Sequence, residues 1–236
     1  MIERRPYGDK KDQYITLRLP TGGKPHAATV FVHGGYWRER FTSSLMSPLE
    51  EKFLEAGWMT INIEYRRGPD NHWPIPSNDV SDAMSMAAQI ADDCGVGGRV
   101  VSVGHSVGGQ LVLLNHRFVD AVVALAPVTD AARVYTEGLG DNAAEEYFRT
   151  SPASRPDLFR AASPIAVSPP AAPTLIVQGT LDDRVPPQHT ESYLQAIGSH
   201  VRVEVLRSNG AGHIDLIDPA AEHWTSTVEW MSNTVS

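Results

Sequence analysis

The chain has 236 residues, of which 42% are hydrophobic and 20% charged, a composition that can fill a large core. Its formal net charge of −8, with Lys and Arg scattered, argues against nucleic acid or a membrane surface as partner. The single cysteine, Cys94, excludes an internal disulfide, and no apolar run reaches the roughly 20 residues that span a bilayer. The charged first residues lack the apolar core of a secretory signal. We expect one cytoplasmic domain over residues 1–236.

Short β-branched runs alternate along the chain with longer helical patterns. The segment 13–19 alternates apolar and polar residues, which predicts an antiparallel strand at a sheet edge. Further strands are predicted at 28–32, 58–64, 99–103, 121–126, 174–178 and 201–206, and helices at 47–56, 78–91, 107–117, 188–196 and 219–233. The alternation predicts an α/β fold with a mostly parallel, twisted sheet and helices on both faces.

One stretch interrupts this alternation. Between Pro127 and Pro173 the chain is rich in Asp, Pro, Ser and Gly and has only short helical stretches, such as 142–149. A connection of this length inside a compact domain is usually functional or disordered. We therefore expect a small lid insertion over about 128–165, with ordinary surface packing as the alternative.

The strongest local signal is the sequence Gly-His-Ser-Val-Gly at residues 104–108, directly between a predicted strand and a predicted helix. In a nucleophile elbow, a serine occupies a strained strand-to-helix turn, and its neighbours must be small to avoid clashes. The turn exposes the hydroxyl and aims the next amide at the developing oxyanion, beside the positive end of the helix. This context predicts Ser106 as nucleophile and the Val107 amide as an oxyanion donor.

A second signal is His-Gly-Gly-Tyr-Trp at residues 33–37, directly after a predicted strand. Enzymes with a nucleophile elbow take a further oxyanion donor from the loop after an early strand. Glycines let a peptide plane turn inward there, so Gly35 and Tyr36 are the predicted donors. The alternative interpretation is a simple Gly-Gly turn without a functional role. The nucleophile elbow favours the oxyanion loop over this alternative.

The acid and the base should follow the serine in the order Ser, Asp, His. Asp182 and Asp183 come after the strand at 174–178, where an orienting carboxylate belongs; we choose Asp182, with Asp183 as the alternative. The small-residue loop 209–212 then leads to His213, the predicted base. These positions imply acyl transfer through an acyl-enzyme.

None of the other histidines is expected to be catalytic. His33 and His105 should shape their turns through ring hydrogen bonds, and four others are expected to face solvent: His116, His189, His200 and His223. No His, Cys and Asp spacing resembles a zinc site, so no metal or other cofactor is expected. Cys94 is expected to end a helix, with Gly95 as the terminating residue.

At these residues the chain resembles the arylformamidase (kynurenine formamidase) and small carboxylesterase branch of the α/β-hydrolases. The resemblance rests on Tyr7-Gly8 and on residues 33–37, 64–67, 104–109, 179–182 and 212–213, in the family's order. It implies the α/β-hydrolase fold and hydrolysis of N-formyl-kynurenine, an aryl formamide, without a cofactor. Related sequences with the same motifs include general esterases, so a small-acyl carboxylesterase is the alternative. Val107 departs from the alanine of many relatives, which could narrow the site near the acyl group.

Aromatic side chains are candidates for contacting an aromatic substrate, chiefly Trp37, Trp73 and Tyr135, although core packing is the alternative for each. Glu64 and Arg66 are expected to form a structural ion pair beside the sheet. The partner is expected to be a small ester or amide, and the sequence leaves a homodimer open. A non-catalytic binding protein on this fold is the remaining alternative, which the complete set of Ser, Asp and His disfavours. A peptidase role is also disfavoured, because no large gating domain is expected.

Overall fold

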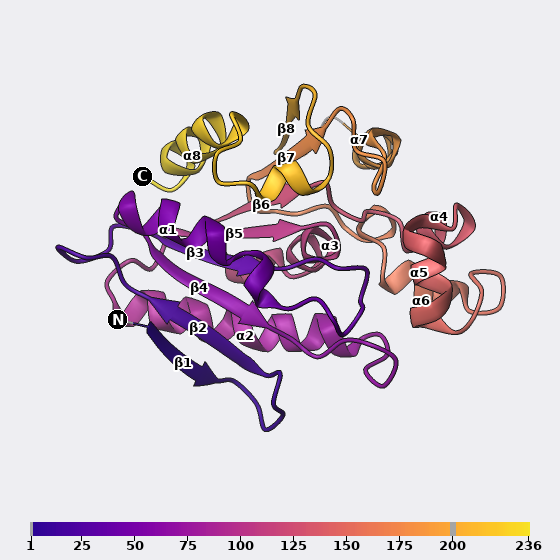
Figure 1. Ribbon diagram of the computed structural model, residues 1–236, viewed down its shortest axis with the longest axis horizontal. Coiled ribbons are helices and arrows are strands. Elements are labelled where there is room, and N and C mark those ends of the chain that lie inside the picture. Colours follow the sequence, from indigo (N-terminus) through magenta and orange to yellow (C-terminus); the bar gives the residue numbers. More distant parts are fainter. Residues whose placement is uncertain (1, 199–201) are drawn as a thin grey trace.

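The alternating strands and helices of the sequence form one continuous sheet with helices on both sides (Figure 1). The computed structural model describes residues 2–198 and 202–236, and over these ranges the sheet has eight strands in the order β1-β2-β4-β3-β5-β6-β7-β8. The strands are β1 (Ile2–Pro6), β2 (Tyr14–Arg18), β3 (Ala28–Val32), β4 (Met59–Glu64), β5 (Val100–His105), β6 (Ala121–Leu125), β7 (Thr174–Gly179) and β8 (Val203–Ser208). The strands from β4 to β8 in this order are parallel to one another, and β2 runs antiparallel to both of its neighbours, β1 and β4.

The predicted fold is confirmed, and the structure differs from the predicted strands at the two edges of the sheet. The segment around β2 is antiparallel as expected, but β1 covers it, so β2 is not the edge of the sheet. The sequence of β1, Ile-Glu-Arg-Arg-Pro, carries no apolar alternation because the strand is largely exposed. The last predicted strand begins later than expected, at Val203; residue 201 lies outside the described residues.

Two helical layers bury the sheet. The helices are α1 (Ser47–Glu55), α2 (Ile75–Asp93), α3 (Val107–Leu114), α4 (Ala131–Thr136), α5 (Leu139–Phe148), α6 (Pro156–Ala161), α7 (Pro187–Ile197) and α8 (His223–Thr234). Side chains of α1 and α8 pack on one face, and those of α2, α3 and α7 pack on the other. The central strands are buried on both faces, which explains why β3, β5 and β6 are apolar without alternation.

The stretch between β6 and β7 holds three short helices, α4, α5 and α6, gathered at one end of the molecule in Figure 1. We call residues 128–165 the β6–β7 insertion. Its α5 begins with Gly140, Asp141 and Asn142 in the left-handed region, at φ of 57–64°, before the regular helix starts. Glycine, Asp and Asn tolerate that region best, so these residue types permit the sharp entry into α5.

The end of α2 lies where the sequence predicts a helix terminus, whereas other helix ends differ by a few residues: α3 ends at Leu114 rather than at 117, and α8 begins at His223 rather than at 219. Cys94 caps the C-terminus of α2 and Gly95 follows at φ 75°, as predicted. None of the helices within the described residues is both long and apolar enough to cross a membrane.

Candidate active site

Ser106 occupies a strained turn between β5 and α3. Its backbone has φ 58° and ψ −116°, a conformation that costs a non-glycine residue about 1–3 kcal/mol. Two backbone hydrogen bonds hold the turn: the Ser106 amide donates to the Leu125 carbonyl at 2.9 Å, and the Ser106 carbonyl accepts from the Val128 amide at 3.1 Å. A Cβ atom at Gly108 would overlap the Val32 carbonyl oxygen and lie 2.6 Å from the His33 carbonyl oxygen, so this turn requires glycine there. The residue pattern of the predicted elbow therefore has a steric cause.

The loop after β3 lies directly against this serine. A Cβ atom on Gly34 would be 2.9 Å from the Ser106 Cβ and 2.7 Å from the His105 carbonyl oxygen. Gly35 and Tyr36 follow with positive φ values of 119° and 51°. Over the described residues, the amides of Gly35, Tyr36 and Val107 donate to no protein acceptor. Three unpaired donors on two neighbouring turns can bind an anionic oxygen.

Asp182 and His213 are brought together by the loops after β7 and β8. The Nδ1 atom of His213 donates to Asp182 Oδ2 at 2.7 Å, and both residues are buried. The other carboxylate oxygen, Oδ1, accepts from the amides of Arg184 and Val185 at 2.9 Å each. Asp183 is exposed, so between the two adjacent candidates Asp182 is the residue that contacts the imidazole.

His105 connects the serine turn to this histidine. Its Nε2 donates to the His213 carbonyl oxygen at 3.0 Å, and the two rings are 4.4 Å apart. Burial, and next the electrostatic influence of His213, lower the pKa of His105 well below its usual range, so the His105 ring is neutral. The ring hydrogen bond expected of His105 is therefore present, and it fixes the main chain of the predicted base. Among the described residues no hydrogen bond joins Ser106 to His213; such bonds commonly tighten only when substrate binds.

A buried ionic cluster supports the loop after β3, and sequence reasoning missed its composition. Glu64 accepts from His33 Nε2 at 3.1 Å, from the Ser43 amide at 2.9 Å and from the Arg67 guanidinium. Burial opposes ionisation of Glu64, but the His33 hydrogen bond, the Arg67 charge and the Ser43 amide outweigh it and hold its pKa at about 2. His33 Nδ1 also contacts the Gly34 carbonyl at 2.8 Å, so His33 shapes its turn as predicted.

The predicted pair of Glu64 and Arg66 is wrong. Arg66 instead binds Asp79 on α2 through two hydrogen bonds, of 2.9 and 2.7 Å, while Glu64 binds Arg67. The Arg66 guanidinium and amide together satisfy the buried carboxylate of Asp79, which Gln13 also contacts at 2.9 Å. The prediction paired Arg66 with Glu64, the nearest carboxylate in the sequence, whereas the fold brings Asp79 of α2 to Arg66.

The expected solvent-facing histidines also need correction. His189 and His223 are buried, and His189 Nε2 contacts Glu137 at 2.8 Å. His116 is half-buried, and His200 lies outside the described residues. Helical position alone did not distinguish inner from outer faces here.

The three aromatic candidates for substrate contact lie in packed surroundings. Trp37 is 1% exposed, stacks on Tyr147 at 5.3 Å and donates from Nε1 to Gln110 at 3.1 Å. Trp73 is buried in the core, and the half-buried Tyr135 packs edge-on against Phe159 at 5.7 Å. In this structure the core-packing alternative describes Trp37 and Trp73, whose burial leaves little surface for a ligand.

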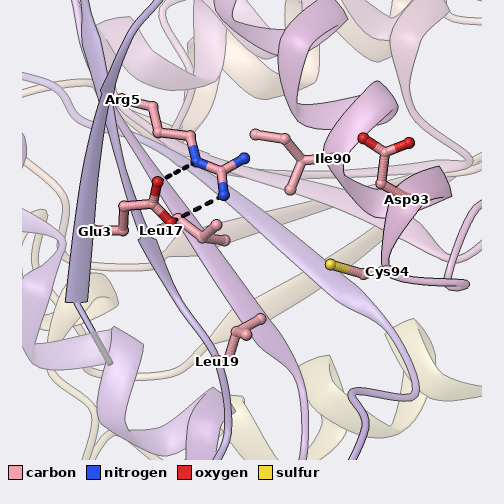
Figure 2. A pocket seen from close by; sticks show the side chains of 7 residues that line it. All are labelled: Glu3, Arg5, Leu17, Leu19, Ile90, Asp93 and Cys94. Carbon is pink, nitrogen blue, oxygen red and sulfur yellow. Dashed lines mark hydrogen bonds and ion pairs between the residues drawn. The ribbon is translucent and has the colours of Figure 1, made fainter.

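A hollow of about 210 Å³ lies at the edge of the sheet formed by β1 and β2, next to the end of α2 (Figure 2). Arg5 points across it and pairs with Glu3 at 2.7 Å, and the half-buried Cys94 lies at its border. Open α/β sheets bind ligands at the carboxyl ends of their parallel strands, where Ser106, Asp182 and His213 lie. The hollow is at the amino ends, so we place the candidate site at the serine. No cluster of three or more metal-ligating side chains occurs within the described ranges.

The parallel sheet, the serine elbow and the carboxylate–imidazole pair after β7 and β8 define an α/β-hydrolase. The chain belongs to the prolyl oligopeptidase family, whose model matches residues 71–235, and the BD-FAE family model matches residues 16–117. A truncated carbohydrate esterase from gut microbiota has the same fold, with a TM-score of 0.82, 18% identity and coverage of 98% of this chain and 95% of that one.

Two curated relatives are 27% identical to the chain. One is esterase LipQ of Mycobacterium tuberculosis, aligned over 85% of this chain and 51% of its own length. The other is the kynurenine formamidase of Meyerozyma guilliermondii, aligned over 80% of this chain and 79% of its own length. The chain thus spans about half of LipQ and most of the formamidase. These similarities agree with the resemblance to the esterase and formamidase branch.

Proposed function

We propose that this protein is a cofactor-independent serine hydrolase that cleaves an ester or amide bond through an acyl-enzyme. In this proposal Ser106 is the nucleophile, His213 the general base and Asp182 the orienting carboxylate. The observation that carries it is the 2.7 Å hydrogen bond from His213 Nδ1 to a buried Asp182, in a loop that contacts the serine turn through His105. The family membership and the esterase and formamidase relatives support the same class of chemistry.

In the proposed mechanism each step of acyl transfer is assigned to a residue of this site. Because Asp182 accepts from Nδ1, the neutral imidazole presents an unprotonated Nε2, which takes the Ser106 proton as Oγ attacks the carbonyl. The amides of Gly35, Tyr36 and Val107 then donate to the oxyanion, each worth about 3–4 kcal/mol in the transition state. The imidazolium protonates the leaving amine or alcohol, and a water activated by His213 releases the acid from the acyl-enzyme.

We propose an aryl formamide, of the kind represented by N-formyl-kynurenine, as the first candidate substrate. The kynurenine formamidase relative supports this candidate, because it aligns over most of its own length. The similarity to esterase LipQ favours an ester as the second candidate substrate, and we propose a small acyl group for it.

The discriminating experiment compares kcat/KM for N-formyl-kynurenine with kcat/KM for p-nitrophenyl acetate, using wild type and Ser106→Ala. The proposal expects hydrolysis of both substrates by wild type, with the formamide at least equal to the ester, and loss of both in the variant. An ester preference of several orders of magnitude would reject the formamide in favour of the ester. Equal turnover by Ser106→Ala would reject the serine mechanism.

A further inference from the structure

The side chain of Tyr36 joins two loops that lie far apart along the sheet. Its phenol donates a 2.5 Å hydrogen bond to the carbonyl of Arg184, 148 residues away. Tyr36 follows β3 and Arg184 follows β7, and the strands β5 and β6 lie between them. Three strand intervals of about 4.8 Å separate the two loops by about 14 Å, so this bond crosses the end of the sheet where Ser106 is located.

The contacts form a closed ring of neighbouring residues that includes the serine. Gly34 lies against Ser106, Tyr36 follows two residues later, and its phenol reaches Arg184. The amide of Arg184 binds Asp182, which binds His213, and His213 contacts His105 next to the serine. The Tyr36 side chain thus links the loop after β3 to the loop after β7, and the His105 side chain links the serine turn to His213.

The β6–β7 insertion holds the Tyr36 ring in place. A Cβ atom on Gly140 would lie 2.6 Å from the Tyr36 ring, in the left-handed stretch that opens α5. The cavity beside it, between this loop and α5, is only about 30 Å³. The Tyr36 ring is therefore packed against the β6–β7 insertion on this side. Burial, and then the nearby charge of Asp182, raises the pKa of Tyr36 to about 12, so at neutral pH its phenol remains a donor.

The tetrahedral intermediate has four substituents, and the site assigns three of them. One is Ser106 Oγ, the oxyanion faces the three amides, and the leaving group must face His213 to be protonated. The acyl group takes the remaining direction, and we infer that this direction leads toward the Tyr36 phenol, whose bond to Arg184 crosses the same end of the sheet. An acyl chain longer than a few atoms would therefore meet the phenol or break its bond to Arg184.

We propose that the Tyr36 side chain determines acyl-chain specificity: its hydrogen bond to Arg184 closes the ring over Ser106 and restricts the hydrolase to short acyl groups. This inference rests on the proposed function, and it assigns the Tyr36 phenol a role distinct from that of the Tyr36 amide. The substrates it selects are formyl, acetyl and similarly small acyl esters or amides.

The test is an acyl-chain series of p-nitrophenyl acetate, butyrate and octanoate with wild type, Tyr36→Phe and Tyr36→Ala. All three proteins keep the backbone amide of residue 36, while Phe removes the hydrogen bond and Ala removes the ring as well. We expect a strong preference of wild type for acetate over octanoate. The ratio of kcat/KM for these two esters should fall about tenfold in Tyr36→Phe, as loss of one neutral hydrogen bond allows, and further in Tyr36→Ala.

Tyr147→Phe is the matched control. Tyr147 also donates a phenol hydrogen bond to a backbone carbonyl, that of Asn71 at 3.0 Å, but this bond does not cross the site. The control should keep the wild-type ratio. An unchanged ratio in both Tyr36 variants would overturn the inference, as would an equal shift in Tyr147→Phe or a shift confined to the leaving group, measured with acetyl esters of phenols of different size.

Labelling of the same proteins with a fluorophosphonate separates the two levels of the proposal. If wild type and Tyr36→Phe are both labelled at Ser106 and their chain-length ratios agree, the inference on Tyr36 fails and the serine hydrolase stands. If wild type is not labelled, both fail. Tyr36→Phe keeps the ring that packs on Gly140, so it provides a result even if Tyr36→Ala does not fold.

Discussion

Replacing Asp182 by Asn should abolish most activity while preserving the fold. In wild type the amides of Arg184 and Val185 donate to Asp182 Oδ1 at 2.9 Å each, and the Asn side-chain oxygen can still accept both hydrogen bonds. The Asn NH₂ group, however, would replace the acceptor that His213 Nδ1 binds at 2.7 Å. The imidazole would then carry its proton on Nε2, where it cannot accept the Ser106 proton. In such a triad the wrong tautomer costs about 10⁴ in kcat, or about 5.5 kcal/mol of transition-state stabilisation.

The measurement is kcat for p-nitrophenyl acetate at pH 7, together with the thermal midpoint of unfolding. Asp183→Asn is the matched control, because Asp183 is the exposed neighbour of Asp182 and this substitution removes the same charge from the same loop. We expect Asp183→Asn to remain within about threefold of wild type and both variants to fold. A loss of less than tenfold in Asp182→Asn, or an equal loss in Asp183→Asn, would refute the assignment of the carboxylate.

Three further variants test the loop after β3, the packing of Trp37 and the burial of His223. Gly34→Ala should lower kcat/KM by about 10² or more, because its Cβ would lie within 3 Å of Ser106 and His105. Gly23→Ala is the control and should keep wild-type kcat/KM, because a Cβ atom there meets no other atom within 4 Å. Wild-type activity in Gly34→Ala would contradict the position of the oxyanion loop. Trp37→Phe should cost about 1–3 kcal/mol in urea unfolding, because it leaves Gln110 without its indole donor, and should leave KM unchanged; a raised KM without destabilisation would instead indicate a substrate contact. Burial lowers the pKa of His223 to about 4 from 6.5, so the stability it contributes when neutral is complete above pH 6.5 and is lost as the pH falls toward 4. His223→Gln should remove about 2–3 kcal/mol of the difference in unfolding free energy between pH 7 and pH 4.5, and an identical pH dependence in the variant would contradict the assignment.

The elbow, its strand and its helix could be predicted because each depends on local chemistry. The turn at Ser106 requires small neighbours, and the buried strands of a parallel sheet require continuous apolar runs. The order of Asp182 and His213 followed from the same reasoning, since both lie directly after strands that the sequence marks clearly. β1 was missed because an exposed edge strand needs no apolar alternation.

Side-chain partners across the fold could not be predicted from one sequence. Arg66 binds Asp79 because α2 brings that carboxylate to the end of β4, a fact of packing that no local pattern carries. The Tyr36–Arg184 bond joins residues 148 positions apart, and it depends on how two loops approach each other above the sheet. The burial of His189 and His223 likewise depends on which helix face meets the sheet.

The most direct test of the account is fluorophosphonate labelling followed by mass-spectrometric mapping of the adduct. Wild type should carry one adduct on Ser106, Ser106→Ala should carry none, and Asp182→Asn should be labelled far more slowly than Asp183→Asn. An unlabelled wild type, or equal labelling of Ser106→Ala, would contradict the central claim that this serine attacks the carbonyl.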